Sequence, residues 1–251
     1  MSATGQTALA CIPIAVACAW LVSECGKVKK IIAVLSILLI LAYNLILGGR
    51  TIIVVLIVCL VLSLVHLIIS GKFINRKKII TIVLLICAII ALLIIFNVFG
   101  LRDAILNSNL YDRFFGEYSQ ELGDDSRGDR KQIYLTRFFE SFWGGTKIRQ
   151  DVGYAHDLYL DTFDYAGIFS LIFVILYIIS SLFRIIKVLK QKKFSFKFKQ
   201  LMFCFYLVAN IEFFIEPILF GMPWFFAAYC LVDGLVYSYL KKGKHYNFIR
   251  G

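Results

Sequence analysis

The chain has 251 residues, of which 60% are hydrophobic and only 17% are charged. Soluble globular domains have roughly 45–50% apolar and about 25% charged residues, so this composition argues against a soluble protein and predicts an integral membrane protein. The formal net charge of +11 is spread over short basic segments between apolar runs. That distribution is typical of membrane topology, and we therefore expect no nucleic-acid partner.

Apolar runs of about 20 residues cross a bilayer as helices, because unpaired backbone groups are costly in lipid. The first run, 5–23, is preceded by no lysine or arginine, so we interpret it as a retained helix and not as a signal peptide. In all, the sequence predicts seven spans: 5–23, 31–47, 51–70, 79–99, 166–186, 201–218 and 224–240.

Lysines and arginines concentrate in segments 27–30, 72–78, 184–199 and 241–244, which alternate with the predicted spans. By the positive-inside rule these segments face the cytoplasm, so the N-terminus lies outside and the C-terminus inside. The predicted fold is an all-α polytopic membrane protein. Residues 1–99 form four spans, 100–165 an extracytoplasmic loop with short helices at 131–142 and 158–165, and 166–251 three spans and a cytoplasmic tail.

The seven cysteines include no CxxC pair, and at least five lie inside apolar runs, so we expect neither a disulfide nor a zinc framework. Cys11, Cys18 and Cys25 repeat every seven residues and share one helix face. This spacing allows a binding stripe, but it is more typical of small-residue helix packing, which is the interpretation we prefer.

Three arginines could bind phosphate at the outer face. Arg50 follows two glycines at the outer end of the third predicted span, and a guanidinium binds phosphate through two parallel hydrogen bonds. The alternative for Arg50 is an interfacial side chain that reaches water. Arg127 and Arg130 are three residues apart and would share a helix face, where a salt-bridge cluster with neighbouring aspartates is the alternative.

His156 is the only histidine in the predicted external segment, and Tyr159 and Asp161 follow it closely. A neutral imidazole accepts a proton from a hydroxyl near neutral pH, whereas lysine and arginine do not. His156 is therefore a candidate general base, with a structural histidine as the alternative.

Three carboxylates, those of Glu212, Glu216 and Asp233, lie within predicted spans, where they normally face a cavity or a partner. They could form the pathway of a transporter or channel, or they could pair with Arg50 and the loop arginines. Glu216 is close enough to the predicted surface to need neither. The sequence lacks HExxH, GxSxG, a Walker loop and a cytoplasmic DxD-like pair, which argues against metalloproteases, P-loop ATPases and cytoplasmic sugar-nucleotide transferases.

Four short motifs between about residues 43 and 177 resemble, in order and spacing, those of the O-antigen polymerase and O-antigen ligase superfamily. They are Leu47-Gly48-Gly49-Arg50, Asp125-Ser126-Arg127, Trp143-Gly144-Gly145, and Ala155-His156-Asp157-Leu158-Tyr159-Leu160 with Gly167 after it.

The resemblance implies a metal-independent glycosyltransferase without a cofactor, which takes its glycan from undecaprenyl diphosphate at the outer face of the bacterial cytoplasmic membrane. It implies that Arg50 and Arg127 hold the diphosphate and that His156 deprotonates or orients the acceptor hydroxyl. Two guanidiniums would neutralise the charge that develops on the leaving diphosphate. Arg130 is added from its spacing alone. Supporting roles are expected for Asp157, Tyr159, Asp161, Glu212 and Glu216.

This sequence departs from the family in two respects. Asp157 stands where members usually have asparagine, and members commonly have ten or more spans. We therefore expect the chain to correspond to the C-terminal part of such an enzyme, with a second chain that supplies the missing helices, or a chain-length regulator, as partner. The expected function is a polysaccharide polymerase that acts on lipid-linked repeat units; a ligase with the same donor and a transporter that uses Glu212, Glu216 and Asp233 are the alternatives.

Overall fold

The computed structural model describes residues 3–23, 25–70, 92, 94–115 and 127–241, and within these ranges all regular structure is helical. Most of the predicted fourth span, 79–99, lies outside the described residues. The other six predicted spans all fall in long helices. The helices are α1 (Ala3–Val22), α2 (Lys27–Leu47), α3 (Arg50–Ile69), η1 (Val98–Gly100), α5 (Leu101–Leu106), α6 (Asn109–Phe115), α8 (Arg127–Thr136), η2 (Phe138–Ser141), α9 (Lys147–Val152), α10 (Leu158–Lys190), α11 (Phe196–Ile215), α12 (Ile218–Gly221) and α13 (Pro223–Lys241).

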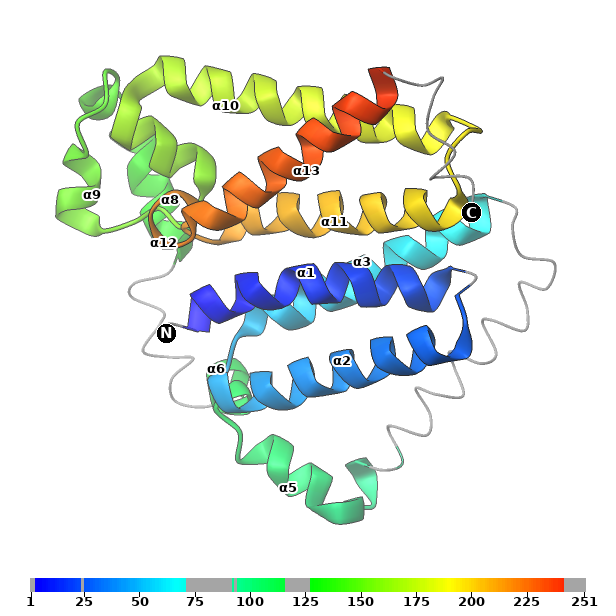
Figure 1. Ribbon diagram of the computed structural model, residues 1–251. Coiled ribbons are helices and arrows are strands. Elements are labelled where there is room, and N and C mark those ends of the chain that lie inside the picture. Colours follow the sequence, from blue (N-terminus) through cyan, green and yellow to red (C-terminus); the bar gives the residue numbers. More distant parts are fainter. Residues whose placement is uncertain (1–2, 24, 71–91, 93, 116–126, 242–251) are drawn as a thin grey trace.

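The long helices form a bundle in which α1 lies between α2 and α11 (Figure 1). Helix α3 contacts both α1 and α11, while α10 and α13 pack on the other side of α11. The short helices α8, α9 and α12 gather at one end of α10 and α11 (Figure 1). The bundle therefore holds a compact helical unit at one of its ends.

Small side chains let α1 approach its three neighbours closely. Ala8, Cys11, Ala15, Cys18 and Ala19 are all buried in the main apolar core. Both of these cysteines are free thiols. For Cys11 and Cys18 the packing interpretation of the seven-residue spacing is thus confirmed.

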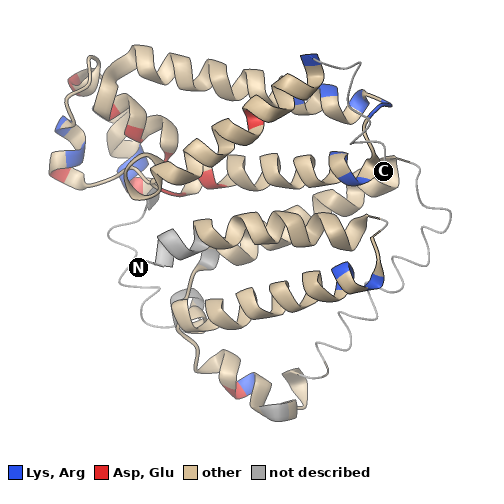
Figure 2. Cartoon of the chain, in the orientation of Figure 1, with Lys and Arg blue, Asp and Glu red and all other residues tan. Residues whose placement is uncertain are grey.

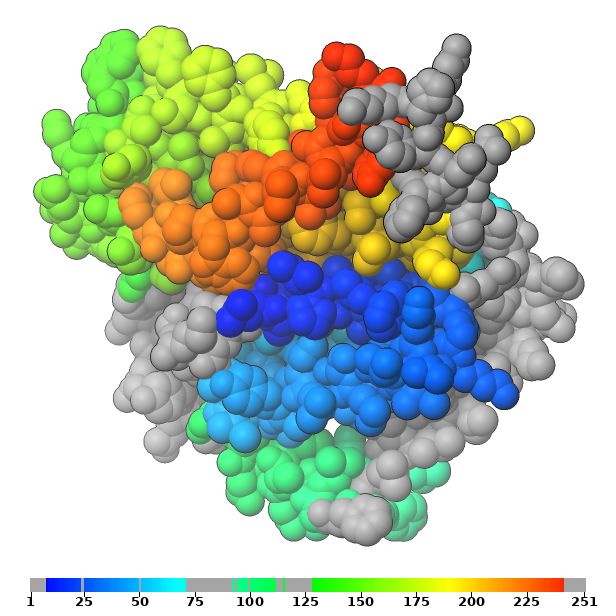
Figure 3. Space-filling model, in the orientation of Figure 1, coloured from blue at the N-terminus to red at the C-terminus, as the bar shows by residue number. Residues whose placement is uncertain are grey.

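Two helices carry large apolar side chains on their outer faces. Leu39 on α2 is 71% exposed and Phe173 on α10 is 68% exposed, and Figure 3 displays α2 on the surface of the bundle. By length and composition, four described helices could cross a membrane: α2, the part of α3 from Thr51, α10 and α11. Apolar faces of this extent are unfavourable in water, so the chain is a membrane protein and lipid surrounds these helices.

The expected helices 158–165 and 166–186 are both present and are joined in α10 across a non-helical bend at Gly167 (φ 80°). Two other predictions were wrong. The expected helix 131–142 divides into α8 and the 3₁₀ helix η2. The basic segment 184–199 is largely helical, because α10 continues through Lys190 and only 191–195 separate it from α11.

Candidate functional site

His156 lies in the segment that joins α9 to α10, in a left-handed backbone conformation with φ 56°. This conformation costs a non-glycine residue roughly 1–2 kcal/mol, so the surrounding structure has to hold it. The residue is half-buried, between α10 and the compact unit formed by α8, η2 and α9, which we call the α8–α9 unit.

Two carboxylates fix the backbone on either side of His156. The Ala155 N–H donates to Asp161 Oδ1 at 2.9 Å. Asp157 caps α10, where its Oδ1 accepts the N–H groups of Tyr159 (2.9 Å) and Leu160 (3.3 Å). Asp157 and Asp161, expected as supporting residues, thus support the histidine through its backbone.

Asp157 stands where the resembled family usually has asparagine, and the negative charge that it adds is paired in the structure. An asparagine oxygen would cap the helix equally well, but only a carboxylate pairs with Lys131, whose Nζ lies 2.9 Å from Asp157 Oδ2. Lys131 also donates to the Phe214 carbonyl at the end of α11. Sequence reasoning missed Lys131, because its partners lie 26 and 83 residues away.

Helix α8 brings Arg130 to the histidine segment. A methyl group added to Gly153 would lie 3.5 Å from Arg130 Nη1, so the guanidinium is close to the backbone three residues before His156. The Tyr134 hydroxyl donates to the Gly153 carbonyl at 2.8 Å, and burial raises the pKa of this phenol, which keeps it a donor. Arg127 begins α8, one turn before Arg130, but its side chain lies outside the described part of the structure.

Arg50 reaches the same end of the bundle from another helix. The turn before it uses a left-handed Gly48 (φ 70°), which closes α2 and lets α3 start at Arg50. The Arg50 side chain is outside the described part, but its neighbour Thr51 donates to Glu216 Oε1 at 3.0 Å. Glu216 is only 1% exposed, so the expectation that it needs no partner was wrong.

The end of α11 therefore joins the predicted pieces. Its last turn contacts Lys131 of α8 through Phe214 and Thr51 of α3 through Glu216. The start of α3 and the first turns of α8, which carry the predicted arginines, consequently lie on this same end of α11.

The membrane carboxylates face two separate interfaces. Glu212 is fully buried and accepts a hydrogen bond from the Cys11 thiol at 3.2 Å, on the α1 side of α11. Asp233 on α13 instead binds Arg184 of α10 at 2.8 Å and accepts the Tyr206 hydroxyl at 2.6 Å. The structure thus does not bring Asp233 together with Glu212 and Glu216, because opposite sides of α11 separate them.

Replacing Asp233 with alanine is expected to destabilise the bundle by about 3–5 kcal/mol, because Arg184 would remain as an uncompensated charge. The apparent melting temperature in detergent should fall by roughly 6–20 °C. The double change Arg184→Leu with Asp233→Leu should restore most of the lost melting temperature, because it removes both charges together. Asp151→Ala is the control, since Asp151 forms only a surface ion pair with Arg137. A stable Asp233→Ala protein would contradict a structural role for the pair.

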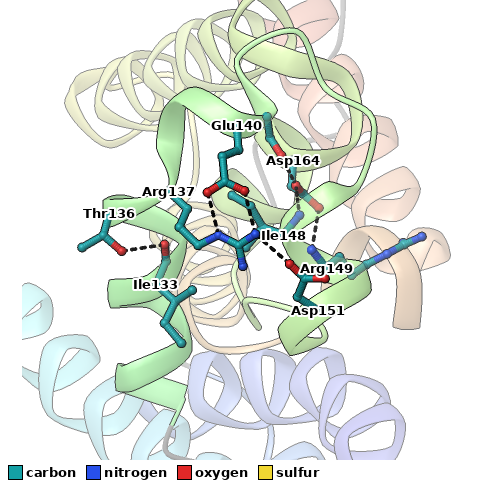
Figure 4. A network of polar contacts seen from close by, with 9 residues as sticks. Ile133, Thr136, Arg137, Glu140, Ile148, Arg149, Asp151 and Asp164 are labelled. Carbon is teal, nitrogen blue, oxygen red and sulfur yellow. Dashed lines mark hydrogen bonds and ion pairs between the residues drawn. The ribbon is translucent and has the colours of Figure 1, made fainter.

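In addition to Asp157 and Asp161, a third carboxylate of α10 stabilises this region: that of Asp164, which caps the N-terminus of α9. It accepts the N–H groups of Ile148 and Arg149, each at 3.2 Å, and also binds the Ser141 hydroxyl (Figure 4). In the same network Arg137 binds Glu140 (Figure 4), and these hydrogen bonds lower the pKa of the Glu140 carboxyl. Asp164 was not predicted, because a carboxylate that caps another helix leaves no local pattern.

Besides these side-chain contacts, the unit also contacts α10 directly through its backbone. The Ile168 N–H donates to the Phe142 carbonyl at 3.0 Å, next to the bend at Gly167. A methyl group on Gly144 would lie 2.7 Å from the Tyr165 oxygen, and one on Gly167 would lie 2.7 Å from the Trp143 carbonyl carbon. Gly144 and Gly167, the glycines of two sequence motifs, therefore allow the backbone at 142–144 to cross close to the backbone at 165–167 of α10.

An apolar groove of about 450 Å³ starts at this unit and runs between α10 and α11. Asp157 and Tyr159 lie at its start, and isoleucines and leucines of α10 line the rest. It is lined by Asp157, Tyr159, Leu160, Ile175, Ile178, Ile179, Leu182, Asn210 and Phe214.

Among the described residues, no group of three or more His, Cys, Asp or Glu side chains is arranged to hold a metal ion. No family model matches the chain, and comparisons with curated proteins and with solved structures gave no significant match.

Proposed function

We propose that this chain is a polysaccharide polymerase that transfers a glycan from undecaprenyl diphosphate to a hydroxyl of an acceptor lipid-linked repeat unit. The acceptor oxygen attacks the anomeric carbon, the bond from that carbon to the diphosphate oxygen breaks, and His156 takes the hydroxyl proton. Arg50, Arg127 and Arg130 stabilise the charge that develops on the leaving diphosphate. A ligase would use the same donor chemistry with another acceptor.

One observation carries the proposal: a histidine held in a left-handed conformation, with Arg130 of α8 beside its segment and the start of α3 at the same end of α11. Strained, non-glycine backbone is concentrated at functional sites, where surrounding contacts enforce it. The carboxylates that hold this segment, Asp157 and Asp161, bind backbone N–H groups.

The groove between α10 and α11 suits the isoprenoid part of the donor. It begins at Asp157, beside His156, and its further walls are aliphatic side chains of α10 with Asn210 and Phe214 of α11. A polyprenyl chain in this groove would place its diphosphate at the histidine segment while the tail stays at membrane depth.

This function requires the outer-face orientation. In our proposal the chain has seven spans with its N-terminus outside and lies in the inner membrane of a bacterium, with the α8–α9 unit on the outer surface. The lysines at 187, 190, 192, 193, 197 and 241 support this orientation, because they lie at or near the ends of α10, α11 and α13 that are opposite the α8–α9 unit. Figure 2 shows basic residues at that end, and others within the unit itself. A chain-length regulator or a chain that supplies further helices is the proposed protein partner.

Arginine substitutions test the diphosphate role in cells that make the polymer. Arg127→Ala and Arg130→Ala should each lower polymer yield about 100-fold, the size of effect seen when one charge-stabilising donor is removed. Arg137→Ala is the matched control, because Arg137 binds Glu140 and Asp151 within the same unit. Yield measured by gel electrophoresis at equal protein level should stay near wild type for the control. Equal polymer yields in the wild type, the two test variants and the Arg137→Ala control would refute the proposal.

A further inference from the structure

A second pocket lies at the end of the bundle opposite the α8–α9 unit. Its volume is about 740 Å³, within the range of small-molecule sites. It is bounded by the last turn of α3, the segment between α10 and α11, and the first turn of α11. Its lining residues are His66, Ser70, Leu189, Lys192, Lys193, Phe194, Ser195, Phe196 and Lys199.

The charged side chains that line this pocket are basic. Lys192, Lys193 and Lys199 contribute to the lining, and none of the described lining residues is acidic. The 20-residue helix α11 also begins here, with Ser195 as its N-cap, so the positive end of its dipole adds to the field. Three ammonium groups and one helix N-terminus thus lie at one cavity, where their positive potential opposes the negative dipole ends of α3 and α10.

Contacts beneath the lysines hold the pocket walls in place. His66 Nδ1 hydrogen-bonds the side-chain oxygen of the buried Gln200, whose amide donates to the Ser63 carbonyl at 3.3 Å. The His66 ring stacks on Phe196 and Phe203, with ring centroids 5.8 and 5.2 Å apart. These contacts fix the positions of His66 and Phe196, two of the residues that line the cavity.

We propose that this pocket binds the phosphate of an anionic ligand, and that the source of the phosphate is the headgroup of an anionic phospholipid. Lysine ammonium groups and helix N-termini bind phosphate, and basic pockets between membrane helices bind anionic headgroups. Leu189, Phe194 and Phe196 line the pocket beside the lysines and supply apolar contact for the glycerol end of the acyl chains. This site is separate from the proposed polymerase site.

The test uses the purified full chain in detergent and native mass spectrometry. The probes are dihexanoyl-phosphatidylglycerol, dihexanoyl-phosphatidylcholine, glycerol 3-phosphate and inorganic phosphate. The pocket variant is Lys192→Gln with Lys199→Gln, and the matched control is Lys190→Gln with Lys197→Gln. The control removes the same charge from the same end of the bundle, and neither of its lysines lines the pocket.

We expect phosphatidylglycerol to bind more tightly than phosphatidylcholine, and the pocket variant to lose about tenfold or more in affinity while the control keeps wild-type binding. Glycerol 3-phosphate that binds as tightly as phosphatidylglycerol would overturn the lipid assignment. Equal losses in both double variants, or no loss in the pocket variant, would overturn the site. If the double variant folds poorly, Lys192→Gln alone serves as the pocket variant, because Lys192 is exposed and its substitution should not disturb folding. Its affinity for phosphatidylglycerol is then compared with that of the control.

Discussion

Replacing His156 with asparagine is expected to lower polymer yield about 100-fold or more, the usual size of a general-base contribution. Asparagine is chosen because it tolerates the left-handed conformation that His156 adopts at φ 56°. It also remains polar, but it cannot take a proton from the acceptor hydroxyl. The change therefore removes proton transfer while it preserves the backbone of the segment.

A second left-handed residue in the same unit gives the control. Thr146 has φ 60° and directly precedes α9, without a side-chain hydrogen bond that caps it, so Thr146→Asn makes the same kind of exchange away from the histidine segment. Polymer length and yield should match the wild type for Thr146→Asn. Normal polymer from His156→Asn at normal protein level would remove His156 from the mechanism.

Replacing Gly167 with alanine is expected to destabilise the protein by roughly 2–6 kcal/mol, because strain and overlap add. The residue has φ 80°, and a methyl group would overlap the Trp143 carbonyl carbon at 2.7 Å and the Phe142 oxygen at 2.9 Å. Gly144→Ala should act similarly from the other side of the crossing, since its methyl group would meet the Tyr165 oxygen. Both changes should separate the α8–α9 unit from α10.

The measurement is the apparent melting temperature in detergent, together with protease sensitivity of the α8–α9 unit. Gly234→Ala is the control, because Gly234 lies in α13 with nothing within 4 Å of an added methyl group. Alanine there should be neutral or stabilise by up to about 1 kcal/mol. A Gly167→Ala protein as stable as the wild type would show that the close crossing does not hold the unit.

Hydropathy predicted that six of the apolar runs are helical, because apolar length is displayed directly in a sequence; four of these helices, α2, α3, α10 and α11, are long and apolar enough to cross a membrane. The sequence also predicted the two helices that meet at the Gly167 bend of α10, but it did not predict the contacts that Asp161, Asp164 and Gly167 make there. Their carboxylates bind N–H groups of the preceding segments, and the glycine admits the backbone of Phe142 and Trp143.

Long-range pairs were the other part that the sequence could not predict. Arg184 and Asp233 are 49 residues apart, and Lys131 and Phe214 are 83 apart, with no periodicity to link them. His156, Asp157 and Arg130 were named from local motifs and spacing, and the structure gathers them in one unit. Their chemical roles stay predictions.

Release of undecaprenyl diphosphate tests the central claim most directly. Membrane vesicles from a bacterium that makes the polymer, deleted for the native gene and complemented with this chain, would be followed for the free lipid diphosphate without added nucleotide sugars. We predict that each new glycosidic bond releases one undecaprenyl diphosphate, and that His156→Asn abolishes this release while Thr146→Asn does not. Polymer growth without release of the lipid diphosphate, or unchanged release by His156→Asn, would contradict the proposed transfer.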